Sequence, residues 1–529
     1  MRLRCVFLLV SAALAAFGCG GSGSGSGTIL PPSAPSVTSI TPAASASGVA
    51  VNTTITATFS RTMSAATINA TTFTLAGPGG APVTGTVAYS SATLTATFTP
   101  AAPLSAGTAY TATITTGATD TASVPLAANF VWNFTTASPP GMATVDFGTA
   151  HQTIRGFGGS TAWMPVMPAP QANALFGSGA GQLGLSILRL RIDPSSTVGG
   201  PNWDTELGNA KEAQALGAIV IAAPWTPPAS FKSNNSTVGG SLNTNSYAAF
   251  ATYLENFVTY MAAGGVNLYA ISIQNEPDAT VTYESCFWTG ATMDTWIANN
   301  SSVLTTKLMM PESESFTTSY SDPALNDASA VGHIAIVAGH LYGTVPSYYT
   351  NAENKGKEVW QTEHYLSPAG AQPTINDALA AAKEIHDSLT VGNYNAYLWW
   401  WVADWNPGNG VTNYGLVDPN YNPTYYGYSL AQYSRFVRPG YVRTNATASP
   451  TASIYLSAFA GNGHSVIVAL NMGASAVSQP ITLVNGTVTT LTPWQTTSAG
   501  GLAQQSAVTV TGNQFTYTLP AQSITTFVQ

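Results

Sequence analysis

Between about residue 145 and about residue 430 the chain alternates short apolar segments with helix-like ones. The apolar segments are rich in β-branched and aromatic residues, as buried strands are. These strand-like segments are Ser186–Ile192, Ala218–Ala223, Leu268–Gln274, Ile334–His340, Glu358–Thr362 and Tyr394–Trp400, and clear helix-like ones are Tyr247–Ala262 and Ile375–Leu389. A repeated strand-then-helix pattern predicts either a closed (β/α)8 barrel or an open, doubly wound sheet.

Two glutamates at the ends of predicted strands decide between these architectures. Glu276 follows the apolar run that starts at Leu268, and Glu363 ends the run that starts at Glu358. Charged residues are only 7% of the sequence, and burying a carboxylate is costly unless it is paired or used. A salt-bridged structural role is the alternative for either residue alone. Two such glutamates in matching contexts favour a functional pair at the carboxyl end of a parallel barrel, and hence an α/β fold with a (β/α)8 TIM barrel.

Segments that alternate every second residue flank the barrel region on both sides. Between residues 37 and 137 such segments, separated by turn residues, predict a small antiparallel sandwich. Its motifs Ala57–Met63 and Val131–Thr136 resemble bacterial Ig-like domains, which implies a spacing role. The pattern returns near residue 431. We therefore expect an Ig-like β-sandwich (37–137), a side β-sandwich domain (142–160 and 431–529) and a catalytic barrel (161–430).

The first residues predict export. Arg2 and Arg4 precede an apolar stretch that is too short to span a membrane, so residues 1–18 are interpreted as a signal peptide. The cysteine in Gly18-Cys19 resembles the lipidated cysteine of a bacterial lipobox, and residues 19–36 then form a Gly/Ser/Pro-rich tether. We expect an exported lipoprotein, anchored at Cys19 to the cell surface or outer membrane, with ordinary cleavage and secretion as the alternative. Cys286 then has no partner for an intramolecular disulfide.

Composition and spacing exclude several other functions. The formal net charge of −8 argues against a basic nucleic-acid-binding surface. His333, His340 and His364 show no zinc spacing, so no metal site is expected. The glycine-rich stretch Gly156–Gly159 lacks dinucleotide spacing and is interpreted as a turn. We therefore expect no cofactor and no nucleic-acid partner, and we expect a monomer.

The two glutamates suit hydrolysis of a glycosidic bond. Hydrolysis with retention needs one carboxyl to protonate the leaving oxygen and a second, about 5 Å away, to attack the anomeric carbon. Glu276 and Glu363 are too far apart in sequence to form a local pair, but two strands of a barrel can bring them together. Asn275 can hydrogen-bond the 2-hydroxyl group of the sugar. His340 and Tyr342 end another predicted strand and could orient the attacking carboxylate, although a packed histidine is the alternative for His340.

Aromatic residues in this region can stack on sugar rings. Three consecutive tryptophans, Trp399 to Trp401, cannot all face one side of a strand, so at least one ring must point elsewhere. Packing in a core is the alternative for about half of the tryptophans. The candidates for sugar binding are Trp163, Trp225, Trp288 and Trp400.

Several long motifs, in order along the chain, resemble glycoside hydrolase family 30. They are Gln152–Gly159, Leu185–Leu190, Ala223–Pro228, Asn267–Asp278, Gly339–Gly343, Trp360–Glu363 and Phe436–Tyr441. The resemblance covers about residue 145 to the end and is closest to the bacterial xylanase subfamily, subfamily 8. It implies a (β/α)8 barrel fused to a side β-domain and retaining cleavage of glucuronoxylan.

By position, the resemblance implies Glu276 as the acid/base and Glu363 as the nucleophile. Since the acid must start protonated and the nucleophile ionised, we expect the higher pKa at Glu276. A bell-shaped rate profile on the acidic side of neutral follows from this assignment. The supporting and substrate-binding positions that the resemblance implies are Asn275, Tyr342, Arg189, Trp400 and Tyr365.

One position departs from the subfamily. Those xylanases carry an arginine and then a tyrosine just after the Trp-Trp of the eighth strand, where they hold the carboxylate of a glucuronic acid branch. The corresponding positions here hold Asp404 and Asn406. An aspartate would repel that carboxylate. We therefore expect an endo-β-1,4-xylanase with weak or no dependence on glucuronic acid branches.

Other functions stay open at this point. Within the same family the chain could be a β-1,6-glucanase or galactanase, or a glucosylceramidase-like β-glycosidase. It could also be a xylanase that does depend on glucuronate. A surface protein that binds polysaccharide without cleaving it is the alternative from another class, and the paired glutamates argue against it.

Overall fold

The computed structural model describes residues 33–136, 141–195, 201–404 and 412–529, and it divides into two units, residues 1–137 and 138–529. The predicted signal peptide, Cys19 and Asn406 lie outside the described residues. No helix of the described ranges is long and apolar enough to cross a membrane.

The first unit is the predicted sandwich, with two four-stranded sheets. Residues of its strands alternate between core and surface, as in β3, where Ile55, Ala57 and Phe59 are buried. Phe73 packs between the sheets against Phe98 and Trp132. One sheet has the order β1-β3-β6-β5 and the other β2-β8-β7-β4, from β1 (Val37–Thr41), β2 (Ala46–Val49), β3 (Ile55–Phe59), β4 (Phe73–Ala76), β5 (Gly85–Ser90), β6 (Thr95–Pro100), β7 (Ala109–Ile114) and β8 (Phe130–Thr136).

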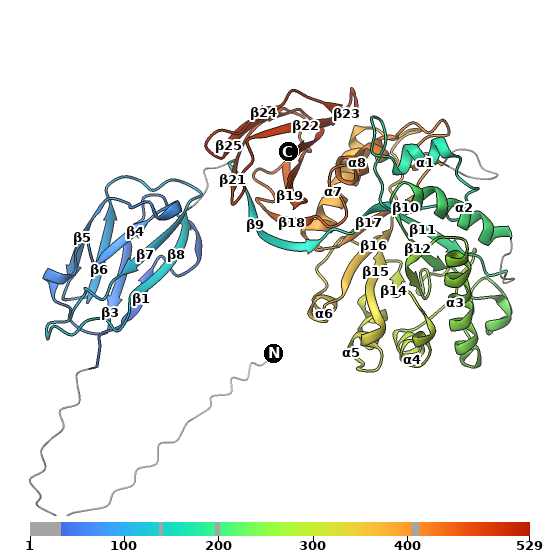
Figure 1. The fold of residues 1–529 in the computed structure, drawn as a ribbon, viewed down its shortest axis with the longest axis horizontal. Coiled ribbons are helices and arrows are strands. Elements are labelled where there is room, and N and C mark those ends of the chain that lie inside the picture. The colour runs from blue at the N-terminus through green and yellow to red at the C-terminus, as the bar shows by residue number, and fades with distance from the viewer. Residues whose placement is uncertain (1–32, 137–140, 196–200, 405–411) are drawn as a thin grey trace, which may run out of the picture. The chain divides into compact units, whose positions relative to one another are not determined.

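The second unit contains a closed barrel of parallel strands, which confirms the predicted fold class (Figure 1). Its strands are β10 (Gly156–Ser160), β11 (Ile187–Ile192), β12 (Ile219–Pro224), β13 (Leu268–Ser272), β14 (Lys307–Ser313), β15 (Ile334–His340), β16 (Glu358–Glu363) and β17 (Ala396–Trp401). The helices around them are α1 (Ala169–Phe176), α2 (Pro201–Ala215), α3 (Tyr247–Ala263), α4 (Gly290–Asn300), α5 (Asp322–Asn326), α6 (Thr350–Asn354), α7 (Ile375–Thr390) and α8 (Tyr425–Ser434).

The interpretation of Gly156–Gly159 as a turn was wrong. These residues form β10, which pairs with β11 on one side and with β17 on the other and so closes the barrel. A Cβ atom at Gly158 would collide with the carbonyl oxygen of Ile187, so glycine is required here by close backbone packing. The barrel therefore begins at residue 156 and not at residue 161, and only β9 (Ala143–Thr153) joins the side domain. The sequence pattern also missed β14.

A cluster of buried residues fills the interior of the barrel. Ile187, Ile221, Met309, Trp360 and Leu398 are among its members, and each comes from a different strand. Their burial follows from the parallel architecture, in which both faces of every strand are covered.

We expect Leu398→Ala to lower the free energy of unfolding of the second unit by about 2–5 kcal/mol, because it leaves a cavity in a closely packed interior. Denaturant unfolding followed by tryptophan fluorescence measures this. Val345→Ala is the control: Val345 is 75% exposed, so this change should stay within about 0.5 kcal/mol. Equal effects of the two changes would contradict the assignment of Leu398 to a rigid core.

The side domain is one ten-stranded sheet that curls over its own core. The ring centroids of Phe515 in β25 and Phe527 in β26 lie 5.3 Å apart, although these strands are distant in the sheet order. The two halves of the sheet therefore enclose a core in the manner of a sandwich. The sheet has the order β23-β22-β26-β20-β19-β18-β9-β21-β25, and β24 pairs with β22. Besides β9, its strands are β18 (Val442–Ala446), β19 (Ile454–Gly461), β20 (His464–Asn471), β21 (Val477–Val484), β22 (Thr490–Thr497), β23 (Gly500–Gln504), β24 (Val508–Thr509), β25 (Gln514–Leu519) and β26 (Ser523–Val528).

Helices α7 and α8 connect the side domain to the barrel. α8 packs against β22 and β26 on one side and β10 on the other. Thr526 of β26 donates a hydrogen bond to the carbonyl oxygen of Gln432 in α8. The predicted boundary at residue 431 therefore falls inside α8, within an interface that holds the two parts together.

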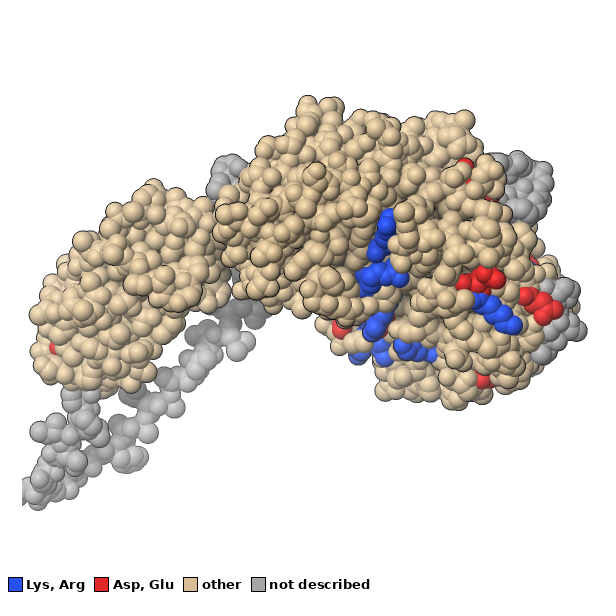
Figure 2. Space-filling model, turned by 45° about the horizontal axis from the view of Figure 1, so that its top comes forward, with Lys and Arg blue, Asp and Glu red and all other residues tan. Residues whose placement is uncertain are grey.

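On the face of the molecule drawn in Figure 2, uncharged residues cover most of the area, apart from a short row of basic side chains and a few acidic ones. Such a surface suits neutral ligands better than polyanions.

Candidate active site

The two glutamates singled out by the sequence meet at the carboxyl end of the barrel. Glu363 is the last residue of β16, and Glu276 follows β13 after a short extension. One carboxylate oxygen of each lies within 4.8 Å of the other. Glu276 has a φ of +46°, an unfavourable backbone conformation that aims its side chain at this point. The residues Glu276 and Glu363 are 5% and 4% exposed, so both are nearly enclosed by protein.

Arg189 connects the parts of the site. It is fully buried in β11, and its guanidinium donates to Glu363 Oε2 at 2.7 Å and to Asn275 Oδ1 at 2.6 Å. A third hydrogen bond runs from Nε to Glu312 Oε1 at 3.1 Å. The guanidinium also lies over the ring of Trp225, 4.6 Å from its centroid. Arg189 therefore fixes Glu363 and Asn275 together.

His340 and Tyr342 lie between the two catalytic candidates. The hydroxyl of Tyr342 donates to Glu363 Oε1 at 3.0 Å. His340 Nδ1 lies 3.0 Å from Glu276 Oε1 and 3.9 Å from Glu363 Oε1. Tyr342 thus contacts the proposed nucleophile, whereas His340 contacts the proposed acid more closely than the proposed nucleophile.

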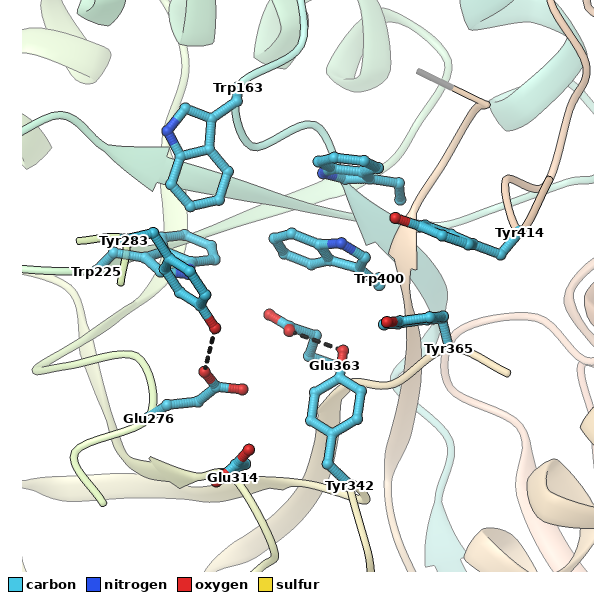
Figure 3. Close-up of a pocket in the computed structure, with 11 residues that line it drawn as sticks. Trp163, Trp225, Glu276, Tyr283, Glu314, Tyr342, Glu363, Tyr365, Trp400 and Tyr414 are labelled. Atoms are coloured by element: carbon cyan, nitrogen blue, oxygen red, sulfur yellow. Dashed lines mark hydrogen bonds between the residues drawn. The ribbon is translucent and has the colours of Figure 1, made fainter. Parts of the chain in front are cut away.

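Tyr283 and Glu312 complete this set and were missed by sequence reasoning. The hydroxyl of Tyr283 donates to the second oxygen of Glu276 at 3.3 Å (Figure 3). Glu312 lies in β14, fully buried, with Oε1 4.0 Å from His340 Nε2. Glu312 had a usable signal, because it too follows a short apolar run, Leu308–Pro311. Tyr283 lies in a loop, where no periodic pattern marks it.

The order of the two carboxyl pKa values is opposite to the one expected from the sequence. Burial and the nearby charge of Glu276 raise the pKa of Glu363. Burial acts in the same direction on Glu276, but the hydrogen bond and charge of His340, the charge of Arg189 and the hydrogen bond from Tyr283 together outweigh burial and lower the pKa. The reason is the positive charge of His340, which the sequence did not predict. Burial opposes this charge, but Glu363, Glu276 and Glu312 together raise the pKa of His340 to about 10.

Glu276, His340 and Glu363 lie close enough for a divalent cation to span their ligand atoms. Two cations, however, already occupy this cluster: the Arg189 guanidinium binds Glu363, and the imidazolium of His340 faces Glu276. A further cation would be repelled by both. The arrangement therefore favours proton chemistry at the carboxyls over metal chemistry.

An aromatic cleft of about 570 Å³ opens above the carboxyls (Figure 3). Tyr365 and Tyr414 stack with ring centroids 4.3 Å apart, and Trp400 stacks on Trp401 at 5.2 Å. Such flat apolar walls with a few polar groups are typical of sugar-binding clefts. The residues that line it are Trp163, Trp225, Glu276, Tyr283, Glu314, Tyr342, Glu363, Tyr365, Trp400, Trp401 and Tyr414.

The structure brings most of the predicted sugar-binding residues to this cleft, but not all. Trp288 packs in the core against Tyr247 and Trp296 and is not among the residues that line the cleft. Trp399 likewise turns outward from β17 and packs against Tyr426, which leaves Trp400 and Trp401 for the cleft. The prediction for Trp288 was wrong because this residue precedes α4, where its ring packs under the helix and not in the cleft.

Asp404 was also misplaced by the sequence alignment. Its carboxylate is buried and accepts hydrogen bonds from the backbone N–H of Gly415 at 2.7 Å and from Thr412 at 3.1 Å. It therefore braces the loop after β17 and does not line the cleft. Tyr414, from that same loop, lines the cleft instead, and no local pattern in the sequence indicated it.

Comparisons with known proteins agree with this geometry. The family model described as "Bacterial Ig-like domain" matches residues 32–136, and the one described as "Glycosyl hydrolase family 30 TIM-barrel domain" matches residues 205–357. Over 397 residues the chain is 38% identical to a glucuronoxylanase of Bacillus subtilis (strain 168), which covers 73% of this chain and 91% of that relative.

Two solved structures are similar over the second unit. One is a glycoside hydrolase family 30 subfamily 8 xylanase from Clostridium acetobutylicum, 42% identical with a TM-score of 0.69. The other is a family 30 endoxylanase from Clostridium papyrosolvens C71, 40% identical with a TM-score of 0.66. Each match covers 73% of this chain and 99% of the other.

Proposed function

Because the chain belongs to glycosyl hydrolase family 30, we propose that it is a retaining endo-β-1,4-xylanase that cleaves xylan with little or no dependence on glucuronic acid branches. In this proposal Glu363 attacks the anomeric carbon and Glu276 protonates the leaving oxygen. Water then hydrolyses the glycosyl-enzyme, with Glu276 acting as the base.

The observation that carries the proposal is the separation of the two carboxyls. Oxygens within 4.8 Å of each other leave no room for a water molecule between a carboxylate and the sugar, which an inverting enzyme needs. The short separation supports direct attack by Glu363. Its hydrogen bonds from Arg189 and Tyr342 orient the attacking carboxylate.

The charges of the buried cluster explain why it holds a proton for the leaving oxygen. Three carboxylates (Glu276, Glu312 and Glu363) face two cations (Arg189 and His340), which leaves one negative charge uncompensated. One further proton makes the buried cluster neutral. An uncharged sugar chain that displaces water from the cleft raises the pKa of Glu276 and favours the proton there.

The weak dependence on glucuronate rests on charge. The charged side chains among the described residues that line the cleft are Glu276, Glu314 and Glu363, all acidic. The sequence holds no lysine or arginine between Lys383 and Arg435, a stretch that includes the whole loop after β17. Without a cation there, a glucuronate carboxylate gains no charged hydrogen bond in this part of the site.

The product profile tests the proposal. Wild-type enzyme should release mixed linear xylo-oligosaccharides from glucuronoxylan, arabinoxylan and linear xylohexaose. The rates per accessible bond should lie within about tenfold, or about 1.4 kcal/mol, of one another, because no charged contact to the branch separates these substrates. Mass spectrometry of the products measures this, with Glu363→Gln as the blank. Cleavage only beside glucuronate would overturn the branch independence. Activity on a β-1,6-glucan alone would overturn the choice of sugar.

A further inference from the structure

Glu312 is a buried carboxylate that the proposed reaction does not use directly. Its side chain is 0% exposed, and its backbone φ is +53°, an unfavourable conformation for glutamate. A buried charge is costly unless it is paired and hydrogen-bonded, so its partners are informative. Arg189 accounts for one of its oxygens, through the hydrogen bond from Nε at 3.1 Å.

Two further contacts point from Glu312 to Glu276. Through its side chain, Oε1 of Glu312 faces His340 Nε2 at 4.0 Å, and the opposite nitrogen of the same ring lies 3.0 Å from Glu276 Oε1. Through its backbone, the carbonyl oxygen of Glu312 accepts a hydrogen bond from the N–H of Glu276 at 3.0 Å. The imidazole thus lies between two carboxylates, with one nitrogen toward each.

We propose that Glu312 is a positioning residue for acid catalysis: it keeps His340 charged and oriented toward Glu276, and it raises the pH at which the His340–Glu276 pair loses its proton. The proposal rests on the proposed function, in which Glu276 protonates the leaving oxygen. An imidazolium between two carboxylates donates one N–H to Glu276 Oε1, so the leaving group meets Glu276 at Oε2, the oxygen that the Tyr283 hydroxyl contacts.

All charged and titratable groups around the ring fit this arrangement. β11 supplies Arg189, β16 supplies Glu363, and the segment after β15 supplies Tyr342, whose hydroxyl is bound to Glu363. Glu276 is flanked by the Tyr283 hydroxyl and, further out, by the negative charge of Glu314. Although burial favours its neutral form, the positive charges of Arg189 and His340 lower the pKa of Glu312 to about 2, so it remains the permanent anion of the cluster.

The test is the pH profile of Glu312→Gln, a change that preserves shape and removes the charge. Without that charge the protons on His340 and Glu276 are held less tightly, so the basic limb of kcat/KM should move to lower pH by about 1 unit or more. An aryl xylobioside with a good leaving group, which needs little protonation, should be affected less than xylan. A basic limb at the wild-type position would overturn the proposal.

Glu358→Gln is the matched control. Glu358 also pairs with an arginine, Arg155 at 2.6 Å, but it begins β16 at the opposite end of the barrel. Its replacement should leave both limbs unchanged even if it lowers the melting temperature. In a His340→Asn background, Glu312→Gln should cause no further shift of the basic limb, because the effect acts through that ring. A further shift of the basic limb by the same amount in this background would show that Glu312 does not act through His340.

A measurement on the wild-type protein covers the case in which Glu312→Gln does not fold. The ¹⁵N chemical shifts of His340, assigned by comparison with His340→Asn, should report an imidazolium at pH 7; a neutral ring overturns the proposal. This result does not depend on the substrate. A charged ring in a protein without xylanase activity would therefore refute the proposed function and leave the Glu312–His340 pair in place.

Discussion

Glu363→Gln should lower kcat/KM on xylan by about 10⁴-fold or more, which corresponds to about 5.5 kcal/mol of transition-state stabilisation. A glutamine amide is too weak a nucleophile to form the glycosyl-enzyme. It has nearly the same shape as glutamate, so the aromatic cleft above it should still bind the sugar chain. The expected result is therefore a loss in kcat with KM changed little, measured by reducing-sugar release and by binding calorimetry with xylohexaose.

The control for this prediction lies on the same strand. Glu358→Gln makes the identical chemical change at the start of β16, far from the cleft, and should retain wild-type kcat. Glu363→Ala with azide gives a second readout: azide attacks the anomeric carbon from the vacated face as the C1–O bond breaks. A single inversion then gives an α-glycosyl azide. Wild-type activity in Glu363→Gln, or a β-azide from Glu363→Ala, would refute the assignment of the nucleophile.

Glu276→Gln should lower kcat on xylan by about 10²–10⁴-fold, since a positioned general acid contributes about this factor. The first step should be nearly unaffected for an aryl xylobioside with a good leaving group, because that group departs without a proton. The pH dependence should change as well. In the wild type, activity rises with pH as Glu363, whose pKa is raised by burial, becomes ionised, and it falls again when the proton at Glu276 and His340 is lost.

In Glu276→Gln no such proton exists, so the basic limb should disappear while the acid limb remains. Azide should restore activity of Glu276→Ala by attacking the glycosyl-enzyme, and the second inversion gives a β-glycosyl azide. Equal losses on xylan and on the activated substrate would argue against Glu276 as the acid. Loss of the acid limb instead of the basic limb would exchange the roles of the two glutamates.

Much of the fold could be predicted because the relevant signals are local. The strand Ile334–His340 and the helix that starts at Tyr247 were predicted with the bounds that the structure shows, to within one residue. β10 was missed because its glycines are explained only by the neighbours that press against them. β14 was missed although its apolar run resembles the others. The register of the strands and the closure of the barrel depend on pairing between strands, which the sequence of a single segment does not encode.

The sequence by itself singled out the two carboxyls that we propose for catalysis. Glu276 and Glu363 each follow a buried strand in a chain with few charges, and the period of a strand and the cost of burying a carboxylate are properties of the local sequence. The long motifs that these residues lie in also determined the family.

Only the tertiary structure decided how the pair is charged and what lies around it. It placed His340 between Glu276 and Glu312, which reversed the expected order of the pKa values, and it turned Trp288 and Asp404 away from the cleft. These outcomes depend on which strands are neighbours and where each loop returns. Electrostatic energies vary with distances of a few ångströms between residues far apart in the chain, so no local pattern contains them.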